Sequence, residues 1–324
     1  MTSQPRELSR RSVLRLSSLG LLGGALTGAL AGCQRPPAAA LVRVAGGEQG
    51  GLYHEFAVLL AQALVRYRVA DAAEPLVTQA STENIELLLR GEAQLGLALA
   101  DSVAVSPAIA EGQISALGRV YQNYFHLLVR AEDPIYQVAD LRGKPLGAGA
   151  KGAGTWLTGQ RLLDTAGLKE PGQGAIEYQL GLNAGLRALT SRRIDAMMIS
   201  GGIAIHAIAQ ANVQTPLRLL DLSSLIPALR AKYPGLYDRV VVPQDTYHGM
   251  PSIHTLGVSN LLIGRTDLPD QLVSDTVRVL VQHAGELIPN TSAGIQFLSL
   301  DNLVATAGQP LHPAAAQTYR ELHG

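Results

Sequence analysis

Residues 140–168, DLRGKPLGAGAKGAGTWLTGQRLLDTAGL, are the stretch that decides how this chain is expected to fold. They predict a strand over Lys144–Ala148, a glycine-rich loop over Gly149–Gly154 and a helix that opens at Thr155. Glycines let backbone amides approach a ligand, and the first turn of a helix has free N–H groups at its positive dipole end. The stretch is therefore typical of a loop that holds an anionic group.

Strands and helices alternate along most of the remaining chain, which predicts parallel α/β sheets. Among the strands, a short one is expected over Leu76–Gln79. Two apolar strands, over Ile114–Arg130 and Thr255–Gly264, are long enough to pass from one lobe to another. We therefore predict an α/β fold of two lobes joined by two crossover strands. Lobe one is expected to contain residues 41–125 and 260–324, and lobe two residues 126–259.

Ligands of such sheets bind where a strand ends and the next helix begins. Four loops of this chain occupy that kind of position, and they are marked by Gly50, Ser81, Gly152 and Gly201. Hydroxyl groups and helix starts at these loops can neutralise a carboxylate with little help from a buried cation. The four loops are therefore the expected ligand site.

The first 33 residues have the pattern of an export signal. Arg10 and Arg11 form a twin-arginine pair, and an apolar, glycine-rich run to Leu30 follows them. The run ends in Leu30-Ala31-Gly32-Cys33, which resembles the lipoprotein box in which the cysteine is lipidated. We expect Cys33 to carry a lipid and residues 34–40 to form a tether. The alternative, one membrane-spanning helix, is disfavoured by the glycines of this run.

Composition excludes several classes of partner. Removing residues 1–32 takes away four of the 26 basic and one of the 26 acidic residues, which leaves 22 and 25 and a formal charge of −3. This balance argues against nucleic acid or a broad anionic membrane surface as a partner. Cys33 is the only cysteine, and the 8 histidines show no metal-ligand spacing. We expect no disulfide and no metal site.

The segment from Gly147 to Gly152 spells G-x-G-x-x-G, so an exported dinucleotide-dependent oxidoreductase is the alternative function. That fingerprint needs an acid at the end of the next strand, about 20 residues further on. Neither Glu170 nor Glu177 is well placed for this role. The G-x-S-x-G pattern of hydrolases is missing as well. We therefore expect no catalytic activity and no cofactor.

Short motifs in a fixed order cover nearly the whole chain after Cys33, and together they carry a resemblance to one family. They are Gly50-Gly51-Leu52-Tyr53, Ser81-Thr82-Glu83-Asn84, the block from Asp140 to Thr155, Ile194-Asp195-Ala196, Thr246-Tyr247-His248-Gly249 and Leu268-Pro269-Asp270. On these residues the chain resembles the solute-binding proteins of tripartite ATP-independent periplasmic (TRAP) transporters. Within them it is most similar to the TAXI branch (TRAP-associated extracytoplasmic immunogenic protein).

The resemblance implies a periplasmic-binding-protein fold, type II-like, whose lobes close over a small organic anion such as glutamate or another carboxylate. It also implies delivery of this ligand to integral-membrane subunits of a TRAP transporter by a receptor that is extracytoplasmic, either lipid-anchored to the cell membrane or periplasmic. Carried over by position, the ligand-binding residues are Gly51, Tyr53, Ser81, Asn84, Gly152, Ala153, Gly154, Thr155 and Tyr247. Gly201 joins them because of the position of its loop.

The chain departs from the family's pattern at three places. The family often has a threonine at the position of Leu52 and a serine at that of Ala153, and a proline is usual where His248 stands. The first two differences remove a hydroxyl from the expected pocket. We therefore expect a ligand that is less polar than glutamate or shaped differently from it.

Overall fold

The computed structural model describes residues 39–289 and 298–323, and everything below concerns those residues. The export signal, Cys33 and residues 34–38 of the expected tether lie outside them. Strand β1 (Ala39–Ala45) begins inside that tether, so Ala39 and Ala40 belong to the fold instead. No helix in the described part of the chain combines the length and the apolar character that a membrane crossing requires.

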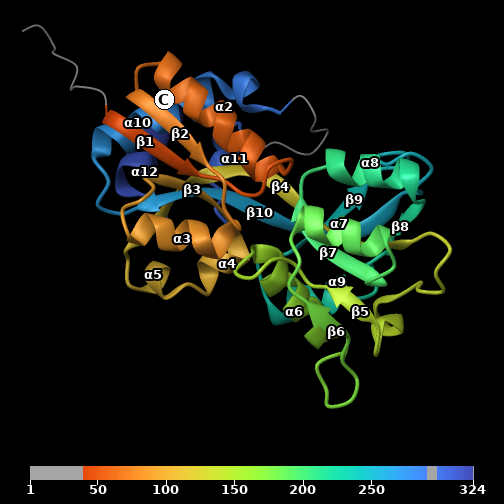
Figure 1. The fold of residues 1–324 in the computed structure, drawn as a ribbon. Coiled ribbons are helices and arrows are strands. Elements are labelled where there is room, and N and C mark those ends of the chain that lie inside the picture. The colour runs from red at the N-terminus through yellow and green to blue at the C-terminus, as the bar shows by residue number, and fades with distance from the viewer. Residues whose placement is uncertain (1–38, 290–297, 324) are drawn as a thin grey trace, which may run out of the picture. The chain divides into compact units, whose positions relative to one another are not determined.

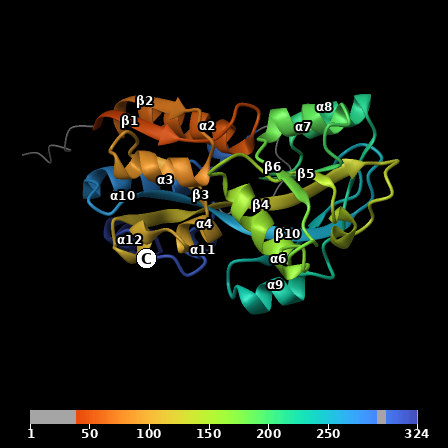
Figure 2. The same cartoon turned by 60° about the horizontal axis from the view of Figure 1, so that its bottom comes forward.

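One sheet of ten strands runs through the described residues, and two long strands lie at its centre (Figure 1). The strand order is β2-β1-β3-β10-β4-β7-β5-β6, while β8 pairs with β4 and β9 with β10. β4 (Ile114–Arg130) pairs with β10 (Ile253–Arg265) along its first part and with β7 and β8 along its second. Figure 2 shows both long strands extending from one group of elements into the other.

The two groups are the two lobes. The first lobe contains β1, β2 (Ala70–Leu76), β3 (Leu95–Leu99), α2 (Leu52–Arg66), α3 (Ser81–Leu89), α4 (Ala100–Ala104), α5 (Pro107–Ala110), α10 (Asp270–Gln282), α11 (Leu300–Leu303) and α12 (Pro313–His323). The second contains β5 (Pro145–Gly147), β6 (Ile176–Tyr178), β7 (Ala196–Gly201), β8 (Leu217–Leu219), β9 (Asp238–Val242), α6 (Gly154–Thr165), α7 (Leu182–Thr190), α8 (His206–Gln214) and α9 (Ile226–Lys232). The expected two-lobed α/β fold with two crossover strands is confirmed. We propose that the chain passes from one lobe to the other near residues 125 and 260, inside the two long strands.

Strand direction follows from this arrangement. β1 pairs in parallel with β2 and β3, and β5 pairs in parallel with β6 and β7. β10 runs antiparallel to β4 and to β3, and β4 runs antiparallel to β7. The expected parallel pairing is found among β1, β2 and β3 and among β5, β6 and β7, while the two crossover strands run against each other because one leaves the first lobe and the other returns to it.

The edge strand β2 was predicted in the wrong place. The sequence favoured a strand over Leu76–Gln79, but β2 covers Ala70–Leu76, ADAAEPL, and most of its residues are partly or fully exposed. An edge strand pairs on one side only and needs little apolar character. Residues 77–80 form instead a loop that enters the first helix turn of α3.

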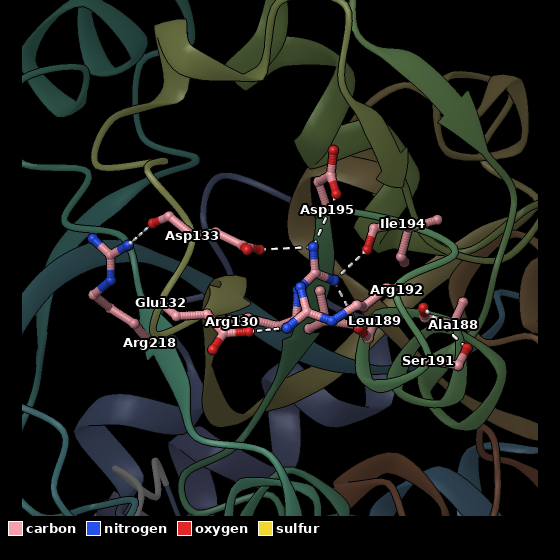
Figure 3. Close-up of polar contacts among 10 residues, drawn as sticks. All are labelled: Arg130, Glu132, Asp133, Ala188, Leu189, Ser191, Arg192, Ile194, Asp195 and Arg218. Carbon is pink, nitrogen blue, oxygen red and sulfur yellow. Dashed lines mark hydrogen bonds and ion pairs between the residues drawn. The ribbon is translucent and has the colours of Figure 1, made fainter.

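A buried arginine fixes the end of β4 to the second lobe (Figure 3). Arg130 is 3% exposed, and its Nη1 donates to the carbonyl oxygens of Leu189 (2.8 Å) and Ile194 (2.7 Å). Its Nη2 lies 2.7 Å from Asp133 Oδ2 and 2.9 Å from Asp195 Oδ1. Both terminal nitrogens of the guanidinium therefore have acceptors, while Nε has none among the described residues, and the two carboxylates balance the buried charge.

Replacing this arginine is expected to destabilise the whole fold. Arg130→Met leaves Asp133 and Asp195 facing each other without their cation, and we expect a loss of about 3–5 kcal/mol in the free energy of unfolding. Urea unfolding followed by circular dichroism measures it. The matched control is Arg192→Met, because Arg192 forms an exposed ion pair with Glu132. We expect less than about 1 kcal/mol there, and equal losses in the two variants would contradict the role given to Arg130.

Candidate functional site

A cavity of about 70 Å³, measured as the space open to the centre of a water-sized sphere, lies between the lobes. Since roughly 10–15 Å³ on this measure holds one water, the cavity has room for about five to seven groups of that size. The first lobe and β4 line it with Gly47, Glu48, Gly51, Leu52, Tyr53, Gln79, Ala80, Ser81, Leu99 and Asn123. The second lobe lines it with Ala150, Ala153, Gly154, Thr155, Gly181, Leu182, Ile199, Ser200, Gly201 and Ile205.

Five helices begin at this cavity. The residue that precedes the first turn lines the cavity in each case, and these residues are Gly51 for α2, Ala80 for α3, Ala153 for α6, Gly181 for α7 and Ile205 for α8. None of them is a serine, threonine, aspartate or asparagine, and none caps its helix with a side-chain hydrogen bond. The positive ends of five helix dipoles thus converge where no side chain of the cap supplies an acceptor.

Most of the site residues expected from the sequence lie in this lining. They are Gly51, Tyr53, Ser81, Ala153, Gly154, Thr155 and Gly201, and Leu52 lies beside them. Ser81 is the first residue of α3 rather than its cap, and its Oγ accepts a hydrogen bond of 3.1 Å from the Leu99 amide. Thr155 Oγ1 accepts one of 3.0 Å from the Ser200 amide. Both hydroxyl groups therefore stabilise the walls of the cavity.

Tyr53 lines the cavity and is 8% exposed. Burial raises the pKa of its phenol, so the hydroxyl group stays neutral across the physiological range. Its oxygen accepts a long hydrogen bond, 3.4 Å, from Asn123 Nδ2. Tyr53 can therefore offer a ligand a hydrogen bond but no charge.

Asn84 and Gly152 do not line the cavity. Asn84 is fully buried: its Nδ2 donates to the carbonyl oxygens of Gly46 (2.6 Å) and Leu97 (2.7 Å), and its Oδ1 accepts from Thr78 Oγ1 (2.6 Å). All of its hydrogen-bonding groups are used within the first lobe. The Gly152 carbonyl oxygen accepts from the Thr82 amide at 3.1 Å, which joins the two lobes beside the cavity.

Tyr247 does not line the cavity either, and it acts through its neighbours. Its hydroxyl oxygen accepts a hydrogen bond of 3.0 Å from the amide of Ile205, the residue before α8. The same hydroxyl lies 2.9 Å from His126 Nε2, and His126 Nδ1 lies 2.9 Å from the Tyr124 carbonyl oxygen. Because that carbonyl can only accept, Nδ1 carries the hydrogen and Nε2 accepts from Tyr247. This series of hydrogen bonds holds the start of α8 in place.

Sequence reasoning missed four polar residues of the lining, namely Glu48, Gln79, Asn123 and Ser200. Asn123 is fully buried within β4, which also contains Gln122 and His126, so a polar residue in this strand did not stand out as a site residue. Within the described residues, Asn123 Oδ1 and Ser200 Oγ are buried without a hydrogen-bond partner. Buried polar atoms are almost always paired, so these two unpaired atoms are available to a group that enters the cavity.

A second contact between the lobes lies outside the cavity, around Asp101 of α4. This carboxylate is fully buried, and its Oδ2 accepts from Thr158 Oγ1 (2.7 Å) and Tyr237 OH (2.8 Å) and lies 3.9 Å from Arg161 Nη1. Burial raises the pKa of Asp101, and these three partners oppose the rise. Because Asp101 belongs to the first lobe and its partners to the second, the cluster holds the lobes together.

This geometry does not support the alternative function, a dinucleotide-dependent oxidoreductase. Glu177, which would have to meet a ribose, lies in β6 and pairs with Lys169 and Gln160 instead of lining the cavity. A cavity of about 70 Å³ is also far too small for a dinucleotide. Across residues 39–289 and 298–323, no three His, Cys, Asp or Glu side chains come together in a way that could hold a metal ion.

Comparison with known proteins identifies relatives of the same fold. The model of the NMT1-like family matches residues 44–322. A protein from Bordetella bronchiseptica RB50 is 14% identical over 88% of this chain and 98% of its own, with a TM-score of 0.55. A protein solved with bound L-arginine is 14% identical over 80% and 93%, with a TM-score of 0.51. The periplasmic aliphatic sulphonate binding protein SsuA from Escherichia coli is 16% identical over 87% and 84%, with a TM-score of 0.46. At these identities the likeness concerns the fold alone.

His126 is expected to make stability depend on pH. Burial lowers its pKa from 6.5 to about 4. Between pH 6.5 and pH 4, His126 is therefore protonated in the unfolded chain but neutral in the native one. Stability from this group is present above pH 6.5 and falls as pH drops towards 4, by about 3 kcal/mol in total. Urea unfolding at pH 7 and pH 4.5 should show a smaller difference for His126→Gln than for the wild type. The exposed His248→Gln variant should keep the wild-type difference, and a wild-type difference in His126→Gln would contradict the assignment.

Proposed function

The chain belongs to the NMT1-like family, and on that premise we propose that it is an extracytoplasmic solute-binding receptor that binds a small carboxylate between its lobes. The observation that carries the proposal is the convergence of five uncapped helix starts on one cavity. Each helix start favours a nearby anion by about 0.3–1 kcal/mol, and by up to about 2 kcal/mol where the site is partly buried. Such a cavity attracts a carboxylate without needing a basic side chain.

The ligand would act as the contact that closes the lobes. Residues from both lobes line the cavity, so a carboxylate bound to α2 and α3 of the first lobe also faces α6, α7 and α8 of the second. A ligand that binds only when both lobes surround it shifts the equilibrium towards the closed state by its differential affinity. The contacts around Asp101 and between Thr82 and Gly152 would then complete closure.

We further propose that the receptor serves a TRAP-type transporter of the TAXI branch, with its integral-membrane subunits as partners and Cys33 as the lipid anchor. Two parts of the motifs on which that resemblance rests, Gly51-Leu52-Tyr53 and Ala153-Gly154-Thr155, support this because they lie in the cavity lining. The ligand class would be an amino acid such as glutamate or another carboxylate. The receptor would have no catalytic activity.

A thermal-shift screen of the chain from residue 34 onwards tests the proposal. A ligand present at 100 times its Kd adds about 2.7 kcal/mol to stability, which raises the Tm by several degrees. We expect amino acids or simple carboxylic acids to do this with no metal or nucleotide added. If a nicotinamide dinucleotide raises the Tm while no carboxylate does, the receptor proposal is wrong and the oxidoreductase alternative replaces it.

Gly154 is expected to be required for closure over the ligand. A Cβ at this position would lie 2.7 Å from both Leu99 Cδ1 and Ser81 Oγ, across the cavity in the first lobe. Overpacking of that kind costs about 1–3 kcal/mol, so Gly154→Ala should weaken carboxylate binding roughly 5- to 150-fold. Isothermal titration calorimetry measures the change. The control is Gly285→Ala, where nothing lies within 4 Å of the added methyl group, and unchanged affinity in Gly154→Ala would place the ligand elsewhere.

A further inference from the structure

Glu48 brings a negative charge to a cavity whose helix starts attract anions. It is the single acid in the lining, and no lysine, arginine or histidine of the described chain lies in that lining. Its carboxylate lies against Gly181, where a Cβ would come within 1.7 Å of Oε1. Within the described residues no hydrogen bond or ion pair of this carboxylate is found. Glu48 is half-buried, so its carboxylate is open to water and equally to a cationic group of a ligand.

Asn123 provides a second acceptor in the same cavity. It is fully buried in β4, its Nδ2 is directed to Tyr53 OH, and its Oδ1 has no hydrogen-bond partner in the described structure. An amide oxygen and a carboxylate are both acceptors, so a ligand carboxylate can satisfy neither of them. A ligand group with several N–H donors can satisfy both.

We propose that Glu48 and Asn123 receive an ammonium group of the ligand, and that the ligand is therefore a neutral, zwitterionic amino acid rather than a dicarboxylic acid. This inference rests on the proposed function, because the ligand's carboxylate is assigned to the helix starts. The two halves of a zwitterion then match the two kinds of group that the cavity offers. A second carboxylate in place of the ammonium would meet Glu48 as a like charge.

The rest of the lining determines which amino-acid side chain the cavity can accept. Leu52, Leu99, Leu182, Ile199 and Ile205 supply an apolar wall. The cavity, about 70 Å³ on the measure given above, favours a compact ligand. We therefore assign the site to small aliphatic amino acids, with L-alanine and L-valine as the probes.

Another role of Glu48 would produce a different result. Because its carboxylate lies beside Gly181, at the start of α7, it could act only as an anion that draws the second lobe onto the first. In that case removal of its charge would lower the affinity for every ligand equally. An ammonium site instead predicts that affinity falls only for ligands that have an amino group.

Matched ligand pairs separate these roles. Isothermal titration calorimetry of the chain from residue 34 onwards would compare L-alanine with propanoate, L-valine with 3-methylbutanoate, and L-glutamate with pentanedioate. We expect the neutral amino acids to bind at least about tenfold more tightly than their deaminated partners and than L-glutamate. In Glu48→Gln the affinity for the two neutral amino acids should fall about tenfold or more, while the affinity for propanoate and 3-methylbutanoate should change little.

The control is Glu111→Gln, which removes an exposed acid at the end of α5, outside the cavity. It should retain wild-type affinities for all six probes. If the deaminated acids bind as tightly as the amino acids, or if Glu48→Gln weakens both kinds equally, the ammonium site is wrong while the carboxylate receptor stands. If none of the six probes binds, the receptor proposal fails together with the ammonium site.

Discussion

The pairing of β4 with β10 is the constraint on which the rest of the structure depends. The two strands hydrogen-bond over most of β10, with irregularities in register at Asn260/Leu261 and Leu262/Ile263. β3 adds to β10 on one side and β7 to β4 on the other, so every further strand of both lobes is positioned through this pair. Every residue of β4 except Arg119 is buried, which explains why a strand of this length carries so few charges. Because β4 also delivers Asn123 to the cavity, the same pairing that joins the lobes places a polar group between them.

The electrostatic character of the cavity arises from the backbone more than from side chains. Parallel strands end at the same edge, and the helices that follow them begin there with their N–H groups facing the cavity. The residues that precede these helices are glycine, alanine or isoleucine, so the usual side-chain acceptors are missing. Glu48 adds the one formal charge of the lining. Dipoles of one sign and a single charge of the other make the cavity suited to a ligand that carries both signs.

The sequence was informative about the loops and less so about individual side chains. Periodicity and glycine content located both long strands and the loop at Gly154, because these signals depend on local physics. Asn84 and Tyr247 looked like ligand contacts by position, yet each is occupied by hydrogen bonds to groups brought close only by folding. Glu48 and Asn123 were overlooked for the converse reason. An acid in a glycine-rich loop and an amide in a strand have no local signature that tells which way they face, and β2 was misplaced because an edge strand needs no apolar pattern.

The continuous sheet also affects how the protein unfolds. One apolar cluster contains Leu60 from the first lobe and Leu162 and Leu163 from the second, together with residues of β4 and β10. Each lobe also has a smaller apolar cluster of its own, but the largest cluster is shared between them, in contrast to two domains joined by a linker. Loss of either lobe would expose apolar surface of the other, so the described chain forms one cooperative unit with a single folding transition. Under the proposed function, closure over a ligand would be a bending within one cooperative unit, and it would occur in β4 and β10, whose residues are almost all buried.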